Sequence, residues 1–408
     1  MAEALFALLA TTAIQLLASM ALVTVPVLAP EASAEVGLSA SLVGFFISIA
    51  YGASMVGALV SGGLVLRHGA IRVSQVALVV CAAGLGCVVI GTQASMVAAA
   101  VLIGLGYGPI TPASSHILAR AAPPDRMSLV FSLKQTGVPL GGAAAGAFVP
   151  PLVLLWGWRG AVAFVAAACI AAALASQPLR AGLDADREPG RRGGSGGAMA
   201  ALRLTIREPM LRRLAACSFC YAVVQYALIG YLVTYLTGAI GYSLVAAGLM
   251  LTVAQVGGAF ARIAWGVVAD RSGRPMRLLG MLAAGMVLGA VATAAFAPTT
   301  PRAWIVAACG FFGAMAIGWN GVFLAQAARF APAGEASVAT AGALFFTFSG
   351  VLVGPSAFAV LLQLGLGYGT AFVLMALPAG GCAAWLLSRN LDAVPGGVER
   401  VKGIEPSS

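Results

Sequence analysis

Long apolar runs, separated by short polar or glycine-rich segments, make up most of this chain. A helix needs roughly 20 apolar residues to cross the hydrocarbon core of a bilayer. The pattern therefore predicts an all-α membrane protein, with ten or eleven spans if a short run re-enters the membrane and twelve if every run crosses it. The twelve predicted spans lie near residues 5–29, 41–66, 73–93, 95–119, 128–154, 159–178, 214–238, 244–269, 278–297, 302–327, 337–363 and 369–388.

One polar stretch interrupts this pattern and divides the spans six and six. It contains the charged, glycine-rich segment Arg187–Gly197, whose composition is typical of a flexible linker. We therefore predict an N-terminal six-helix bundle, a cytoplasmic linker, a C-terminal six-helix bundle and a disordered cytoplasmic tail. Their predicted bounds are 1–178, 179–213, 214–388 and 389–408.

The composition excludes a soluble fold. Of 408 residues, 61% are hydrophobic and only 9% are charged, with a mean hydropathy of +0.98, whereas soluble proteins carry about 25% charged residues. The net charge of +10 does not indicate nucleic-acid binding, because the arginines lie in short clusters between apolar runs. The seven cysteines lie inside apolar runs at no regular spacing, so neither a disulfide framework nor a metal site is predicted, and we expect no cofactor.

The distribution of basic residues predicts the orientation in the membrane. If the N-terminus is inside, Arg159 and Arg302 are the only two of the 23 basic residues in the outside loops. Cytoplasmic loops of membrane proteins carry an excess of arginine and lysine. Both termini are therefore expected in the cytoplasm, which also requires an even number of spans.

The two predicted bundles share short sequence repeats. The segment Gly62–Gly69 at the end of span 2 is echoed by Gly266–Gly273 at the end of span 8. Likewise, Ala119–Pro123 after span 4 is echoed by Ala328–Pro332 after span 10. Two repeated bundles that rock about a site between them are a common architecture of secondary transporters.

The loop Gly266-x-x-x-Asp270-Arg271-x-Gly273-Arg274 resembles the signature loop of the major facilitator superfamily between helices 8 and 9. The resemblance covers the whole chain and implies a twelve-helix transporter of two pseudo-symmetric bundles. Glycines permit a tight turn here, and an Asp–Arg pair across helix ends holds one conformation closed. The first-half copy has Leu66 where the family usually has aspartate. The residues predicted for this conformational latch are Arg67, Gly69, Gly266, Asp270, Arg271, Gly273 and Arg274.

Two basic residues lie inside the predicted spans, whereas all 13 acidic residues lie at span ends, in loops or in tails. Lys134 on helix 5 and Arg262 on helix 8 are each about two turns from the cytoplasmic end of their span, or roughly 10 Å deep. The superfamily resemblance implies that helices 5 and 8 face each other, and so that the two cations lie together. The alternative is that both side chains extend to the cytoplasmic interface.

A buried pair of like charges needs a counter-ion, and we expect the substrate to supply it. Arginine grips a carboxylate through two hydrogen bonds, and lysine adds a point charge. Arg262 also resembles a helix-8 arginine of the oxalate/formate and monocarboxylate branches, where it contacts the substrate carboxylate.

Further polar residues lie on helices 1, 4, 7 and 10, which line the cavity in the family. We predict that Gln15, Tyr107, Gln225 and Asn320 contribute to substrate binding, although hydrogen bonds between helices would explain each equally well. His116 is the only histidine inside a span and is a candidate proton site. A histidine at a helix end is more often structural.

Helix 5 also carries Gly137-x-Pro139-x-Gly141-Gly142, a partial match to a motif of antiporter members. Glycines in membrane helices more often permit close packing. Both interpretations remain open at this point.

Together these features predict a secondary transporter that moves a small organic anion of the carboxylate class by alternating access. The bacterial inner membrane is the expected location, with lipid around a monomer and a proton or counter-anion as coupled partner. The alternatives are an efflux carrier for neutral amphipathic drugs and a non-transporting sensor of the same fold. No acid pair or nucleophile–base set indicates an enzyme.

Overall fold

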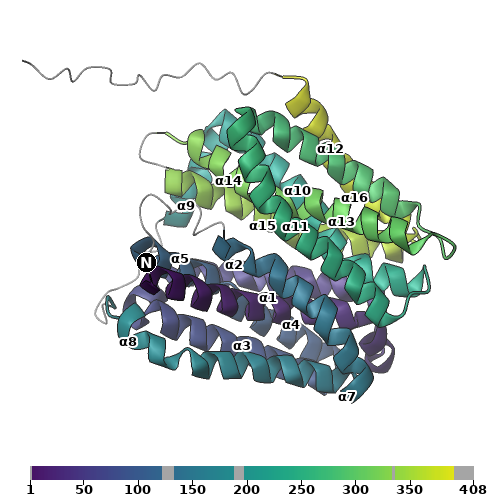
Figure 1. Ribbon diagram of the computed structural model, residues 1–408, viewed down its shortest axis with the longest axis horizontal. Helices are drawn as coiled ribbons and strands as arrows, with labels where there is room; N and C mark the ends of the chain where they lie inside the picture. Colours follow the sequence, from purple (N-terminus) through teal and green to yellow (C-terminus); the bar gives the residue numbers. More distant parts are fainter. Residues whose placement is uncertain (1, 122–132, 188–196, 333–335, 390–408) are drawn as a thin grey trace, which may run out of the picture.

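The computed structural model describes residues 2–121, 133–187, 197–332 and 336–389. The predicted tail, the centre of the glycine-rich linker and the start of span 5 lie outside these described residues. Within them, every regular element is a helix (Figure 1). The prediction of an all-α protein is therefore confirmed.

The first bundle is built from the purple-to-teal helices of Figure 1. Pro109, which has no backbone N–H, follows Gly108 at the break between α4 and α5; together these two helices make up predicted span 4. The helices are α1 (Ala2–Val36), α2 (Val43–His68), α3 (Ala70–Ile90), α4 (Gln93–Tyr107), α5 (Ile110–Ala121) and α7 (Gly137–Ala175).

The second bundle lies beside the first and is coloured green to yellow in Figure 1. Its helices are α10 (Pro209–Gly238), α11 (Leu244–Ser272), α12 (Pro275–Ala294), α13 (Arg302–Gly318), α14 (Asn320–Arg329), α15 (Ala336–Gln363) and α16 (Tyr368–Leu387). Short elements connect the spans: η1 (Ala40–Leu42), η3 (Gln177–Leu179), α8 (Arg180–Leu183) and α9 (Gly197–Arg207).

Eleven helical stretches among the described residues are long and apolar enough to cross a membrane. The longest, Leu133–Leu183, reverses at Gly157, where φ is 69° and ψ is 170°. After this reversal the chain runs antiparallel to α3: Arg159 donates to the Val89 carbonyl near one end of α3, and Gln75 donates to the Ala173 carbonyl near the other. With its two limbs counted separately, the described residues make twelve passes.

Two predicted boundaries differ from the observed helices. α1 continues to Val36 rather than ending near residue 29, although it contains Pro26 and Pro30. α10 begins at Pro209 rather than near residue 214. Proline is tolerated inside membrane helices and at the first turn of any helix. Hydropathy marks where a helix leaves the apolar layer, whereas the helix itself continues into the polar layer.

The second part of the predicted linker contains a helix. Residues 197–207 form α9, which packs against the start of α15. Ala201 and Thr205 are buried on its inner face and lie directly against Gly342 of α15. The linker therefore attaches to the second bundle through α9.

We call the end of the bundles with the α2–α3 and α11–α12 turns the basic end, and the other the opposite end. The two bundles are joined at the opposite end. The Tyr231 hydroxyl accepts a hydrogen bond from the Gly44 N–H (3.1 Å) and lies 2.8 Å from the carbonyl oxygen of Ser41 and 3.1 Å from that of Pro355. Gln363 donates to the Ser41 hydroxyl at 2.9 Å.

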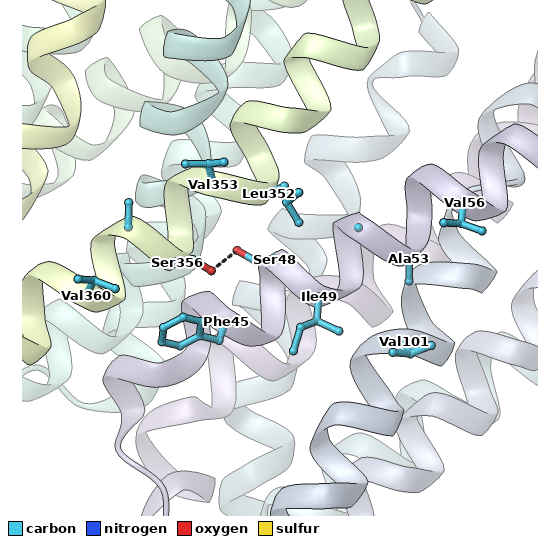
Figure 2. Close-up of a pocket in the computed structure, with 12 residues that line it drawn as sticks. Phe45, Ser48, Ile49, Ala53, Val56, Val101, Leu352, Val353, Ser356 and Val360 are labelled. Carbon is cyan, nitrogen blue, oxygen red and sulfur yellow. Dashed lines mark hydrogen bonds between the residues drawn. The ribbon is translucent and has the colours of Figure 1, made fainter. Parts of the chain in front are cut away.

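Further toward the basic end, the bundles touch along two pairs of helices. Ser356 of α15 donates to Ser48 of α2 at 2.7 Å, beside an apolar groove of about 700 Å³ (Figure 2). The first limb of α7 packs against α11, with Gly146 and Gly248 in backbone contact. Gly142 likewise lies against Gln255 of α11. The glycines in the first limb of α7, which corresponds to predicted helix 5, thus permit close packing here.

Candidate functional site

Lys134 is enclosed where α1, α5 and the start of α7 meet. Its side chain is 1% exposed. The ammonium group donates to the side-chain oxygens of Gln15 (3.0 Å), Gln135 (3.3 Å) and Thr111 (3.4 Å). All three acceptors are neutral, and no carboxylate among the described residues reaches this ammonium. The lysine charge is therefore solvated by the protein but not neutralised.

Arg262 approaches the same point from the second bundle. Its Nη1 donates to the main-chain carbonyl of Gln135 at 3.1 Å, and its Nε donates to the carbonyl of Ile317 at 3.0 Å. Gln135 thus accepts from Arg262 through its backbone and from Lys134 through its side chain. The structure brings the two predicted cations together around a single residue.

A layer of tyrosines lies beside the cations, toward the opposite end. Tyr51 of the first bundle donates to Tyr226 of the second at 2.5 Å. The Tyr51 ring meets the rings of Tyr226 and Tyr107 edge to face, with centroids 4.8 Å and 5.9 Å away. This cluster spans the interface between the bundles.

A cavity of about 20 Å³ lies at this layer, between the two bundles. A space of this size holds about one water molecule, so the described conformation is closed around it. A substrate would require the bundles to separate here. The polar lining residues include Ser19, Tyr51, Tyr107, Gln225, Tyr226, Gln255 and Arg262.

Of the remaining predicted binding residues, Tyr107 and Gln225 line this cavity, whereas Gln15 and Asn320 do not. Gln15 is fully buried and bonds Thr111 as well as Lys134. Gln225 lines the cavity and accepts from the Trp319 indole at 3.1 Å and from the Asn320 amide at 3.4 Å. Asn320 therefore positions Gln225 and does not itself line the space.

Sequence reasoning did not single out Gln135, Gln255 or Tyr51. Gln135 directly follows Lys134, and Gln255 lies two turns before Arg262 on the same face of α11. Helical spacing could therefore have indicated Gln255, and adjacency to Lys134 could have indicated Gln135. Tyr51 had no such signal, because it belongs to α2 and enters the site only through packing against α10.

The predicted proton site, His116, lies away from the two cations. Its Nε2 is 2.6 Å from the Asp186 carboxylate, which also pairs with Arg120 at 2.5 Å. The pKa of Asp186 lies below its usual value: partial burial raises it, but the hydrogen bond with His116, a backbone hydrogen bond and the charges of Arg120 and His116 lower it by more. This cluster lies at the basic end and ties α5 to the segment after α8.

The residues predicted for the latch in the second half lie around the α11–α12 turn. Gly273 ends α11 in the left-handed conformation, with φ 62°. Gly266 lies about one turn before the exposed Asp270 on α11, and Arg271 and Arg274 flank the turn. In the described part of the chain, Asp270 forms no ion pair.

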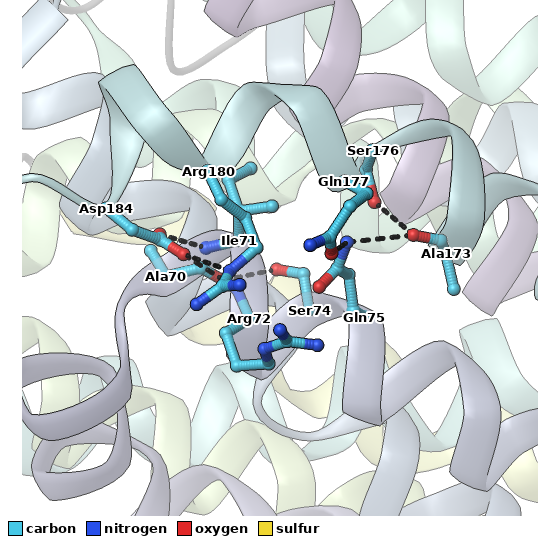
Figure 3. Close-up of polar contacts among 10 residues, drawn as sticks. All are labelled: Ala70, Ile71, Arg72, Ser74, Gln75, Ala173, Ser176, Gln177, Arg180 and Asp184. Atoms are coloured by element: carbon cyan, nitrogen blue, oxygen red, sulfur yellow. Dashed lines mark hydrogen bonds and ion pairs between the residues drawn. The ribbon is translucent and has the colours of Figure 1, made fainter.

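The first-half turn is fastened differently, by Asp184 (Figure 3). Its buried carboxylate accepts from the backbone N–H groups of Ile71 (2.7 Å) and Arg72 (3.1 Å), at the start of α3, and from Arg180 Nε (3.3 Å). A carboxylate at a helix N-terminus satisfies N–H groups that have no partner within the helix. Asp184, which lies 113 residues after Ile71, therefore supplies the carboxylate that the first-half turn lacks at Leu66.

Comparison with known proteins gives one matching family. Residues 8–355 match the family described as the Major Facilitator Superfamily. Two Mycobacterium tuberculosis proteins, each described as an uncharacterized MFS-type transporter, are 29% identical over 185 residues. The match covers 44% of this chain and 40% of theirs, so the chain spans less than half of the length of these relatives.

Solved structures of transporters have the same fold. A bacterial homolog of the human lysosomal transporter Spinster, inward-facing and unoccupied, gives a TM-score of 0.68 at 17% identity and covers 95% of each chain. A peptide transporter POT in complex with sulfate gives 0.74 at 15% identity and covers 95% of this chain and 94% of its own. At these identities the likeness establishes the fold alone.

Proposed function

The chain belongs to the Major Facilitator Superfamily, a family of membrane transporters rather than enzymes, and we propose that it moves a small organic anion of the carboxylate class by alternating access. The observation that carries this proposal is the pair of cations at Gln135. Lys134 and Arg262 come from different bundles, yet both donate to this residue.

The charge of the site supports an anionic substrate. Two cations held by neutral oxygens in a membrane interior repel each other and remain uncompensated. A bound carboxylate removes this imbalance, because it accepts from the guanidinium and the ammonium together. Since one cation belongs to each bundle, the anion also draws the bundles toward each other.

The position of Arg262 on α11, which corresponds to helix 8 of the family, also supports an anionic substrate. Arg262 resembles the helix-8 arginine that contacts the substrate carboxylate in the oxalate/formate and monocarboxylate branches. We propose that the basic end faces the cytoplasm of a bacterial inner membrane, as the arginine distribution predicts. No carboxylate among the described residues lies beside the cations, so the proposed coupling is a proton carried with the anion, or exchange for another anion.

Uptake into proteoliposomes tests the proposal. Purified protein is assayed against a panel of small carboxylates, with and without an imposed pH gradient. We expect Lys134→Gln and Arg262→Gln each to lower uptake at least about tenfold, because one partner of a desolvated charge contact is lost. Arg262→Lys keeps the charge but loses the planar fork and is expected to retain a fraction of the activity.

Arg203→Gln is the matched control, because it removes an exposed charge from α9 and is expected to transport normally. Correct insertion of each variant is checked by its elution as a single species in detergent. Normal carboxylate uptake by both Lys134→Gln and Arg262→Gln would exclude the anion site.

The alternative of drug efflux has one observation in its favour. The groove beside Ser48 and Ser356 measures about 700 Å³ and is lined mainly by apolar side chains (Figure 2). A neutral amphipathic molecule could enter it from the bilayer. Efflux of a neutral dye that is unchanged in Lys134→Gln and Arg262→Gln would favour this function, and a sensor would show no flux of either substrate class.

A further inference from the structure

A second large cavity lies on the outer side of the first bundle, away from the interface between bundles. Its volume is about 930 Å³, and its lining comes from α2, α3, α4, Pro109 and the segment after α7. None of the lining residues belongs to the second bundle. The cavity is therefore separate from the site around Gln135.

The two ends of this cavity differ in chemistry. Along the helices its wall is apolar, and Val60, Leu64 and Val76 are 54%, 41% and 54% exposed. On a membrane-spanning bundle such side chains face lipid tails. At the basic end the lining changes to Arg67, His68, Arg72, Arg180 and Arg187.

Three of these arginines, Arg67, Arg72 and Arg187, are not neutralised by any described carboxylate. Two described carboxylates lie in this segment: Asp184 is buried and already bonded to Arg180 and to backbone N–H groups, and Asp186 pairs with His116 and Arg120. No described carboxylate pairs with the side chains of Arg67, Arg72 or Arg187. The open arginines thus lie at the mouth of an apolar groove.

We propose that this cavity binds an anionic phospholipid. Its phosphate lies among Arg67, Arg72 and Arg187, and its acyl chains lie along the wall formed by Val60, Leu64 and Val76. Basic pockets between membrane helices bind anionic headgroups through the charge of their arginines. A small soluble anion would leave the apolar wall uncovered, and a lipid of zero net charge would leave the charge of the arginines unbalanced.

Native mass spectrometry of the purified full chain tests this assignment. Delipidated protein is titrated with equal amounts of phosphatidylglycerol and phosphatidylcholine, and we expect preferential retention of phosphatidylglycerol. The double variant Arg72→Gln/Arg187→Gln removes side-chain charge and keeps the backbone contact of Arg72 with Asp184. It is expected to weaken phosphatidylglycerol binding roughly tenfold and to leave phosphatidylcholine binding unchanged.

Arg203→Gln/Arg207→Gln is the matched control, because it removes the same charge from α9; it is expected to keep the lipid preference. Val76→Trp fills the apolar wall and is expected to weaken lipid binding with all arginines present, which tests the site even if the arginine variant unfolds. Thermal unfolding midpoints verify the fold of each variant. Equal loss of phosphatidylglycerol from both double variants, no lipid preference in the wild type, or displacement of the lipid by inorganic phosphate would each overturn the proposal.

Discussion

The two bundles have related turns at their basic ends. An acidic side chain from elsewhere in the chain binds the first turn, whereas no acid binds the second among the described residues. In the first bundle, Gly69 has φ 93° and ψ 150°, and the Asp184 side chain fills the space beside it. In the second bundle, Gly273 has φ 62° and ψ 12° with open space around it. Its acid, Asp270, is exposed and forms no ion pair among the described residues.

This difference indicates that the two related turns have different functions. In the first bundle, the acidic residues come from the segment after α8, and they connect this segment to other helices of the same bundle at the basic end. Asp184 binds the start of α3, and Asp186 binds α5. The second bundle keeps its acid in the turn, where it remains available for a partner in another conformation. We therefore interpret the first turn as a structural fastening and the second as the conformational latch.

The largest expected effect comes from Asp184→Ala. This change leaves two backbone N–H groups and Arg180 without their shared acceptor inside the first bundle, so we expect a loss of about 2–4 kcal/mol in stability. The measurement is the thermal unfolding midpoint of the purified protein in detergent.

Asp270→Ala is the matched control for that variant and is expected to change stability by less than about 0.5 kcal/mol, because an exposed, unpaired acid contributes little. It is expected instead to slow uptake in proteoliposomes. Equal stability losses for the two variants would contradict the proposed division between fastening and latch.

Substitution of the glycine in each turn is expected to reduce stability by a smaller amount. In Gly69→Ala, a Cβ would lie 2.3 Å from the Asp184 carboxyl carbon, in a backbone region open to glycine almost alone, and we expect a loss of about 2–3 kcal/mol. Gly273→Ala meets no neighbour within 4 Å and is expected to cost about 1 kcal/mol from left-handed strain. Chemical denaturation of both variants checks the order, and a larger loss for Gly273→Ala would reverse it.

A further small effect on stability concerns Asp186 and its dependence on pH. Because its folded pKa lies below its unfolded value, its contribution is fully present above the ordinary aspartate pKa of about 3.9 and is lost as pH falls through the folded pKa. We expect Asp186→Asn to cost less than about 1 kcal/mol at pH 7, and the difference from wild type to shrink toward pH 3.

Unfolding curves at several pH values measure the contribution of Asp186. Arg329→Gln is the control, because Arg329 is the sequence counterpart of Arg120 in the second bundle and no described carboxylate pairs with it; its effect is expected to be near zero at every pH. A difference for Asp186→Asn that grows on acidification would contradict the assigned sign.

The fold could be predicted from the sequence because each membrane span is visible as an apolar run long enough to cross the bilayer. Charges are rare inside the spans, and this rarity alone was enough to indicate Lys134 and Arg262. The contribution of Asp184 could not be predicted, since its position in a polar segment indicated a linker, and only tertiary folding returns it to α3. The same holds for Tyr51 and for the α9 contact with α15, which depend on packing between segments far apart in the sequence.

The hydroxyl of Tyr231 has a consequence for the balance between states. It carries a single hydrogen but lies near two carbonyls, those of Ser41 in the first bundle and Pro355 in the second. The contacts with Gly44 and Ser41 cross between the bundles and exist only while these are joined at the opposite end, and neither touches the cations at Gln135. A tyrosine remote from the substrate therefore biases how the population divides between the two access states, so Tyr231→Phe would alter the occupancy of each state and leave the selectivity of the carrier intact.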